Sequence, residues 1–252
     1  MKDPLRIPRV LDALRSVWEA QPDLTLPQVY GILETRGIAW NSTDEEVLEV
    51  LDALATERPA RLPADLKESS GGSGRFLVET EQPAHRVTID DTWAAVRPAR
   101  SGQKTRAGRP GAAEMPQPTV WRHGGVRAAS VGGPLTIIDT EGFVHRFGLV
   151  SRIGQIAEDV PPGPLTSLSG LRRDRLDGHV YHLQLVGDEF TGASLVVDRT
   201  LWLFDVSRRS VERDNFRWMS LVTADVGEPV QVKLADGTML RLPELERITV
   251  LE

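Results

Sequence analysis

A segment near the middle of the chain most constrains how the protein can fold. Residues 97–118 read RPARSGQKTRAGRPGAAEMPQP and contain almost no large apolar side chain. A segment of this composition cannot bury a core and is typical of a linker. The whole chain has 252 residues, enough for one large domain or two small ones. We therefore predict a domain at residues 1–96, a linker at 97–118 and a second domain at 119–252.

The first 60 residues carry the apolar period of an α-helix three times. The first stretch places five apolar residues on one helical face: Val10, Leu11, Leu14, Val17 and Trp18. Thr25 and Gln28 have the spacing of a capping box before the second stretch, and Thr43 and Glu46 have it before the third. These signals predict three helices.

The period then changes to the alternation of a β-strand. The segment SSGGSG reads as a hairpin tip between Leu62–Glu68 and Arg75–Glu81, and His85–Asp90 adds a short strand. Three helices followed by a glycine-tipped hairpin is the element order of a winged helix-turn-helix domain, and residues 8–90 resemble that superfamily. The resemblance implies a third helix that enters the DNA major groove.

Residues 119–252 contain about eight short strands at roughly ten-residue spacing. We expect three hairpins: PLTIID with FVHRFGLV, HVYHLQLV with ASLVVD, and VQVKLADGTMLRL, which turns at Asp236-Gly237. The segment 207–218 fits either a helix or a loop. The fold class we predict is α+β, with a winged-helix-like three-helix domain and a C-terminal β-rich barrel or sandwich.

The net charge of −6, from 30 basic and 36 acidic residues, is unevenly distributed along the chain. Residues 1–60 hold six Lys and Arg against 11 Asp and Glu, a net charge of −5, whereas residues 97–127 hold seven against one, a net charge of +6. The third helix has no basic residue before Arg58, so DNA phosphates would be repelled. We expect this domain to contact a protein partner instead, through Trp40, Glu45, Glu49 and Asp52.

The alternative is a DNA-binding transcriptional regulator. Arg106-Ala107-Gly108-Arg109-Pro110 resembles the AT-hook, which implies contact with the minor groove of A/T-rich DNA, although Ala107 departs from the motif. In this interpretation the wing and the linker would supply the nucleic-acid-binding residues: Lys67, Arg75, Lys104, Arg106 and Arg109.

Catalytic and metal-binding chemistry has little support in the sequence. The absence of cysteine excludes a disulfide, a cysteine-ligated metal and a thiol nucleophile. His179 and His182 would point to opposite faces of a strand, and whether they converge with His145 depends on the fold. The cluster Arg172-Arg173-Asp174-Arg175 reads as self-paired surface charge. We predict no catalytic residue, no metal and no cofactor, and leave a hydrolase or nuclease as a third interpretation.

No apolar run reaches the roughly 18 residues that span a bilayer, and the N-terminus lacks the apolar core of a signal peptide. We therefore expect a cytoplasmic protein without a membrane partner. The leading hypothesis is a non-catalytic adaptor whose acidic helical domain docks a partner protein, while its β-rich domain supplies a second contact or forms a homo-oligomer.

Overall fold

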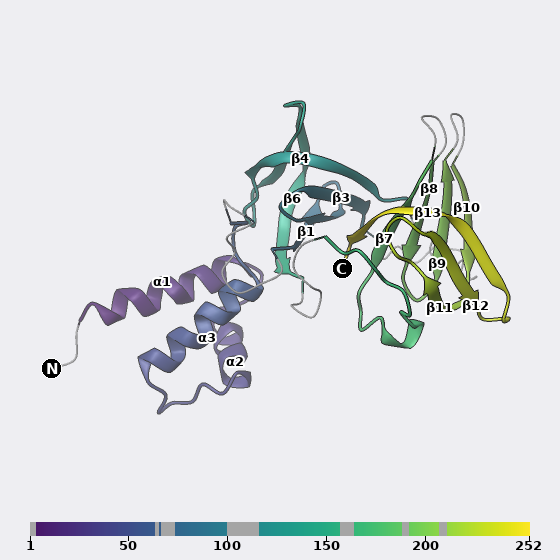
Figure 1. The fold of residues 1–252 in the computed structure, drawn as a ribbon. Coiled ribbons are helices and arrows are strands. Elements are labelled where there is room, and N and C mark those ends of the chain that lie inside the picture. The colour runs from purple at the N-terminus through teal and green to yellow at the C-terminus, as the bar shows by residue number, and fades with distance from the viewer. Residues whose placement is uncertain are drawn as a thin grey trace, which may run out of the picture. The chain divides into compact units, whose positions relative to one another are not determined.

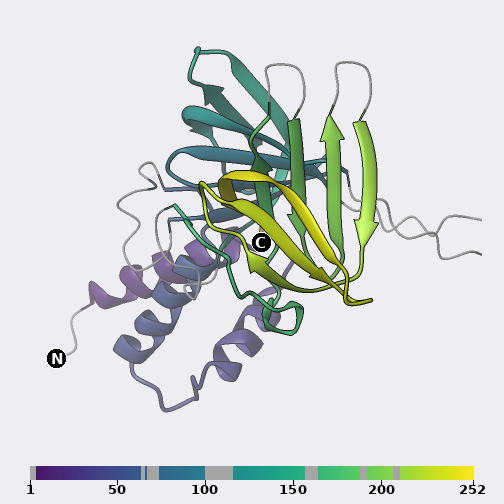
Figure 2. The same cartoon turned by 45° about the vertical axis from the view of Figure 1, so that its right-hand side comes forward.

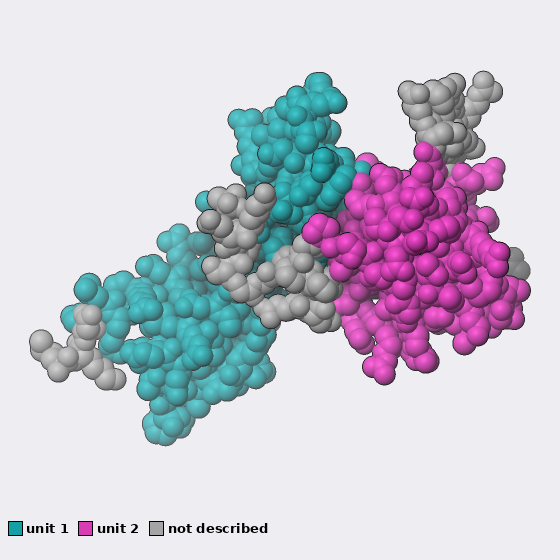
Figure 3. All heavy atoms as spheres, viewed as in Figure 1, with its two compact units in different colours: residues 1–101, 120–160 teal, residues 102–119, 161–252 magenta. Residues whose placement is uncertain are grey.

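The computed structural model describes residues 4–63, 66, 74–99, 116–156, 164–187, 192–206 and 211–252. The chain forms two compact units, which Figure 3 colours teal (residues 1–101 and 120–160) and magenta (residues 102–119 and 161–252). Three helices precede thirteen strands in the described residues, so the α+β class is confirmed. None of the described helices is long and apolar enough to cross a membrane.

The three predicted helices are present as α1 (Arg6–Glu19), α2 (Leu26–Thr35) and α3 (Asp44–Glu57). Both predicted capping boxes form: the amide of Thr25 donates to Gln28 Oε1 at 2.7 Å, and that of Thr43 to Glu46 Oε2 at 2.7 Å. Helices α1 and α2 both pack against α3 (Figure 1). Their shared core consists of Val17, Val29, Leu33, Leu51 and Leu54.

Helix α1 buries less of its apolar face than its sequence predicts. Val17 is buried, and Leu14 packs partly against the helical core. Leu11 and Trp18, predicted on the same inner face, are 56% and 37% exposed. The contact with α3 covers only one side of α1, so part of the apolar stripe faces solvent.

The next six strands close into a barrel in the order β1-β2-β3-β4-β5-β6. They are β1 (Phe76–Glu81), β2 (His85–Ile89), β3 (Trp93–Pro98), β4 (Thr119–Ala128), β5 (Pro134–Asp139) and β6 (Val144–Gln155). Antiparallel pairing of β1 with β6 closes the barrel, with Val78 opposite Ile153. The predicted hairpin from PLTIID and FVHRFGLV is confirmed as β5–β6.

The barrel corrects the predicted domain boundaries. Strand β3 ends at Pro98, inside the segment 97–118, and β4 begins at Thr119, so the chain between them connects two neighbouring strands of one barrel rather than two domains. The two halves share one core, because Val87 and Ile89 from the first half pack in the same cluster as Leu135 and Ile137 from the second.

The predicted hairpin around SSGGSG is also corrected. Strand β1 pairs with β2, so the turn after β1 lies at Gln82 to Ala84. The segment 69–73 lies outside the described residues, and before it Arg61 forms only an isolated bridge with Ser130. The relation of residues 8–90 to the winged-helix superfamily stays a prediction.

The second unit is a seven-stranded antiparallel sheet in the order β10-β9-β8-β7-β13-β12-β11 (Figures 1 and 2). Its strands are β7 (Tyr181–Leu185), β8 (Gly192–Val197), β9 (Leu201–Val206), β10 (Val211–Phe216), β11 (Trp218–Thr223), β12 (Pro229–Leu234) and β13 (Met239–Val250). The β7–β8 hairpin and the β12–β13 hairpin, with Gly237 at a φ of 88°, confirm two predictions. The undecided segment 207–218 contains strand β10, so neither expectation for it holds.

Candidate protein-interaction surface

Helix α3 presents three predicted partner-binding residues in one row. Glu45, Glu49 and Asp52 follow each other at spacings of four and three residues, so they lie within about 60° of one another around the helix axis. The buried residues Leu51 and Leu54 lie on the opposite side of α3. All three carboxylates are exposed, and we name them the acidic row.

Some acidic groups of the helices are neutralised by arginine, but the acidic row is not. Arg6 forms an ion pair with Asp44, and Arg36 binds Glu57 through two hydrogen bonds of 2.8 and 2.7 Å. This hydrogen-bonded guanidinium holds the pKa of Glu57 below its ordinary value. Within the described part of the chain, the three side chains of the acidic row have no ion pair or hydrogen bond. Their charge is therefore available to a ligand.

Trp40 lies in the turn that precedes α3. The amide of Ser42 donates to the carbonyl of Ala39 at 3.0 Å, and the amide of Ala39 donates to Ser42 Oγ at 3.0 Å. These two bonds close the turn around Trp40, whose side chain is 98% exposed. Trp40 therefore faces solvent and does not pack over the helical core.

The residues predicted to contact nucleic acid are not brought together in the described chain. Lys67, Lys104, Arg106 and Arg109 lie outside the described residues. Arg75 is described and is only 5% exposed, because it directly precedes β1 of the barrel. A buried guanidinium cannot reach a DNA phosphate, so no geometry of the described residues supports the predicted wing contact.

The histidines do not form a metal site. His145 Nε2 lies 2.8 Å from Asp139 Oδ2 on the barrel and holds the pKa of that carboxyl below its ordinary value. In the second unit His182 is buried in β7, while His179 precedes that strand and its Nδ1 lies 3.1 Å from the carbonyl oxygen of Glu252. No cluster of three metal-ligating side chains occurs among the described residues.

The arginine cluster at residues 172–175 is only partly self-paired. Arg172 binds Asp174 through two hydrogen bonds of 3.0 and 2.9 Å, which confirms the prediction for that pair and lowers the pKa of the Asp174 carboxyl. Arg173 makes no such bond to a described residue. It lines a recess together with Arg199, whose neighbours in sequence give no signal for a site.

No family model and no curated protein matches the chain.

Proposed function

We propose that the protein is a non-catalytic adaptor whose helical domain docks a basic segment of a partner protein. The observation that carries the proposal is the near-complete exposure of Trp40 in a closed turn next to the acidic row. Tryptophan is enriched among the residues that dominate binding energy at protein interfaces, and a closed turn loses little entropy on binding.

The charge of the helical domain defines the class of partner. Residues 1–60 carry a net charge of −5, from six basic and 11 acidic residues, and several of the basic residues are already paired. The three free carboxylates of the acidic row would attract lysine or arginine side chains and speed the encounter at low salt. We therefore infer a partner segment that combines basic residues with an apolar pocket for Trp40.

The exposed side of α1 gives further support. Ile7 and Leu11 are exposed together with Trp18, at the spacing of one helical stripe. An uncovered apolar stripe on a small helical domain is typical of an interaction site. The second unit would then contribute a second contact or self-association.

A photo-crosslinking residue at position 40 tests the proposal. The full chain would carry p-benzoylphenylalanine in place of Trp40, and a control would carry it in place of Met239, which is exposed in the second unit. We expect a discrete adduct with a protein rich in basic residues from position 40 and not from position 239. The yield of this adduct should fall when the acidic row is neutralised by Glu45→Gln, Glu49→Gln and Asp52→Asn.

Three outcomes would contradict the proposal. The first is no adduct at position 40, and the second is an adduct that the neutralised acidic row leaves unchanged. The third is an adduct of the chain with a second copy of itself. A parallel titration of labelled duplex DNA by fluorescence anisotropy tests the alternative, because salt-sensitive binding that Arg106→Ala and Arg109→Ala abolish would instead support a DNA-binding regulator.

A further inference from the structure

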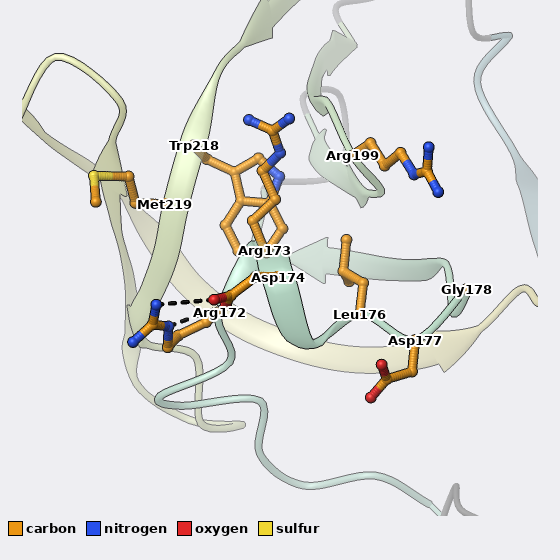
Figure 4. A pocket seen from close by; sticks show the side chains of 9 residues that line it. All are labelled: Arg172, Arg173, Asp174, Leu176, Asp177, Gly178, Arg199, Trp218 and Met219. Carbon is orange, nitrogen blue, oxygen red and sulfur yellow. Dashed lines mark hydrogen bonds and ion pairs between the residues drawn. The ribbon is translucent and has the colours of Figure 1, made fainter.

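The second unit contains a recess of about 760 Å³ whose walls come from distant parts of the sequence (Figure 4). Its volume falls in the range of about 300 to 1,000 Å³ that is usual for small-molecule sites. Arginine and aspartate side chains form part of the wall, and Leu176, Trp218 and Met219 supply apolar surface. The recess therefore combines charged and apolar groups, as ligand sites commonly do.

Main-chain hydrogen bonds hold the arginine-bearing segments in place. Gly170 donates to the carbonyl of Leu221 on β11 at 2.8 Å, and the amide of Leu221 donates to Leu171 at 2.9 Å. These bonds fix the segment immediately before Arg172. On the other wall of the recess, Trp218 Nε1 donates to the carbonyl of Asp198 at 2.7 Å. This bond holds the β8–β9 turn against the first residue of β11. That turn carries Arg199.

Two of the three arginines of the recess have no acidic partner among the described residues. Arg172 is neutralised by its two hydrogen bonds to Asp174. Arg173 and Arg199 are exposed, and their guanidinium groups have no hydrogen bond or ion pair with any residue that the structure describes. Figure 4 draws the Asp174 carboxylate turned towards Arg172, and the Asp177 carboxylate on the opposite side of the view from the guanidinium of Arg173.

We propose that this recess binds the phosphate group of a small organic phosphate. Planar guanidinium groups pair with phosphate oxygens through two parallel hydrogen bonds, and Arg173 and Arg199 are the free donors. The exposed thioether of Met219 would contact the organic part of the ligand. This site does not depend on the docking of a partner by the helical domain.

Calorimetric titration of the full chain tests the proposal with three probes: ADP, inorganic phosphate and adenosine. We expect ADP to bind saturably with a dissociation constant below about 1 mM at low salt, and adenosine not to bind, because it offers no anion. Binding of inorganic phosphate as tight as that of ADP would identify the free anion as the ligand, and weaker binding would identify an organic phosphate. Either result retains the phosphate site.

Charge-neutralising variants assign the binding to the recess. Arg173→Gln and Arg199→Gln should each weaken ADP binding about tenfold or more, the usual effect of losing a hydrogen bond to a charged group. Asp174→Asn should tighten it, because it releases Arg172. The matched control is Arg241→Gln, which removes an exposed arginine of β13 that does not line the recess, and it should leave the affinity unchanged.

The proposal is overturned by any of three results: ADP does not bind, adenosine binds as tightly as ADP, or Arg241→Gln weakens binding as much as Arg173→Gln. Circular dichroism of each variant checks that the sheet is intact. The affected arginines are exposed and unpaired within the described chain, so these substitutions should not reduce stability measurably.

Discussion

The substitution Gly148→Ala should unfold or strongly destabilise the barrel. A Cβ at position 148 of β6 would lie 2.6 Å from the carbonyl oxygen of Pro83 and closer still to that of Glu81. Ordinary van der Waals contacts of a Cβ begin near 3.4 Å. The turn between β1 and β2 would therefore have to move away from β6 by at least 0.8 Å, the difference between 3.4 and 2.6 Å. The clashing atoms belong to the backbone, so rotation of a side chain cannot relieve the contact.

The turn is also held from its other side. Thr80 Oγ1 donates to the carbonyl of Pro83 at 3.1 Å and accepts from the amide of His85 at 3.2 Å. Overpacking of a filled site usually costs about 1 to 3 kcal/mol, and a backbone clash in a fixed turn belongs at or above the upper end of that range. We therefore expect Gly148→Ala to lower the free energy of unfolding by about 3 kcal/mol or more.

Urea denaturation followed by circular dichroism measures this effect. The matched control is Gly154→Ala in the same strand, because a Cβ there meets no atom within 4 Å. The control should change the free energy of unfolding by less than about 0.5 kcal/mol. If the two variants are equally stable, the β1–β2 turn does not lie against β6 and the barrel does not close as described.

Three further predictions concern stability and pH. Leu51→Ala removes a fully buried side chain of α3 and should cost about 2 to 5 kcal/mol by urea denaturation; a cost below about 1 kcal/mol would mean that the helical core is not packed as described. A double-mutant cycle with Arg36→Gln and Glu57→Gln should give only a small favourable coupling, since the pair is largely exposed, and an unfavourable coupling would contradict the ion pair. The hydrogen bond from His145 lowers the pKa of Asp139 in the folded state. The ionised Asp139 therefore stabilises the fold at pH values above the unfolded-state pKa, and this stabilisation is lost as the pH falls through the folded-state pKa. Carboxyl NMR titration should show that pKa rising towards its ordinary value in His145→Gln, and an unchanged value would exclude the hydrogen bond.

Local signals in the sequence predicted local structure well. The capping boxes at Thr25 and Thr43 form because each depends only on residues three apart, and the Asp236-Gly237 turn forms because its geometry favours glycine at positive φ. The hairpins β5–β6 and β7–β8 likewise join strands that are neighbours in sequence.

Long-range pairing could not be predicted in the same way. The composition of residues 97–118 does not reveal that β3 and β4, at the two ends of this segment, are neighbours in one barrel. Residues 100–115 of the segment lie outside the described residues. Strand β10 was missed because its residues, VERDNF, lie at the edge of a sheet, with five of the six exposed, and so show no apolar alternation.

The candidate sites were predictable to different degrees. The acidic row follows from helical spacing alone, so the sequence identified it together with its exposure. The sequence does not specify the exposure of Trp40, nor the two hydrogen bonds that close its turn. The recess was not predicted because its lining residues come from three separate segments of the chain, and a long-range hydrogen bond from Trp218 to Asp198 links two of them.

The most direct test of the proposed docking function is the affinity of the captured partner for purified chains that differ at one exposed aromatic residue. Trp40→Ala should weaken binding about 30-fold, the effect expected of an interface residue worth about 2 kcal/mol. Tyr30→Ala, which removes an exposed aromatic side chain from α2, is the control and should change the affinity less than about threefold. Equal affinities of the wild type and Trp40→Ala, with both chains folded, would contradict the docking function.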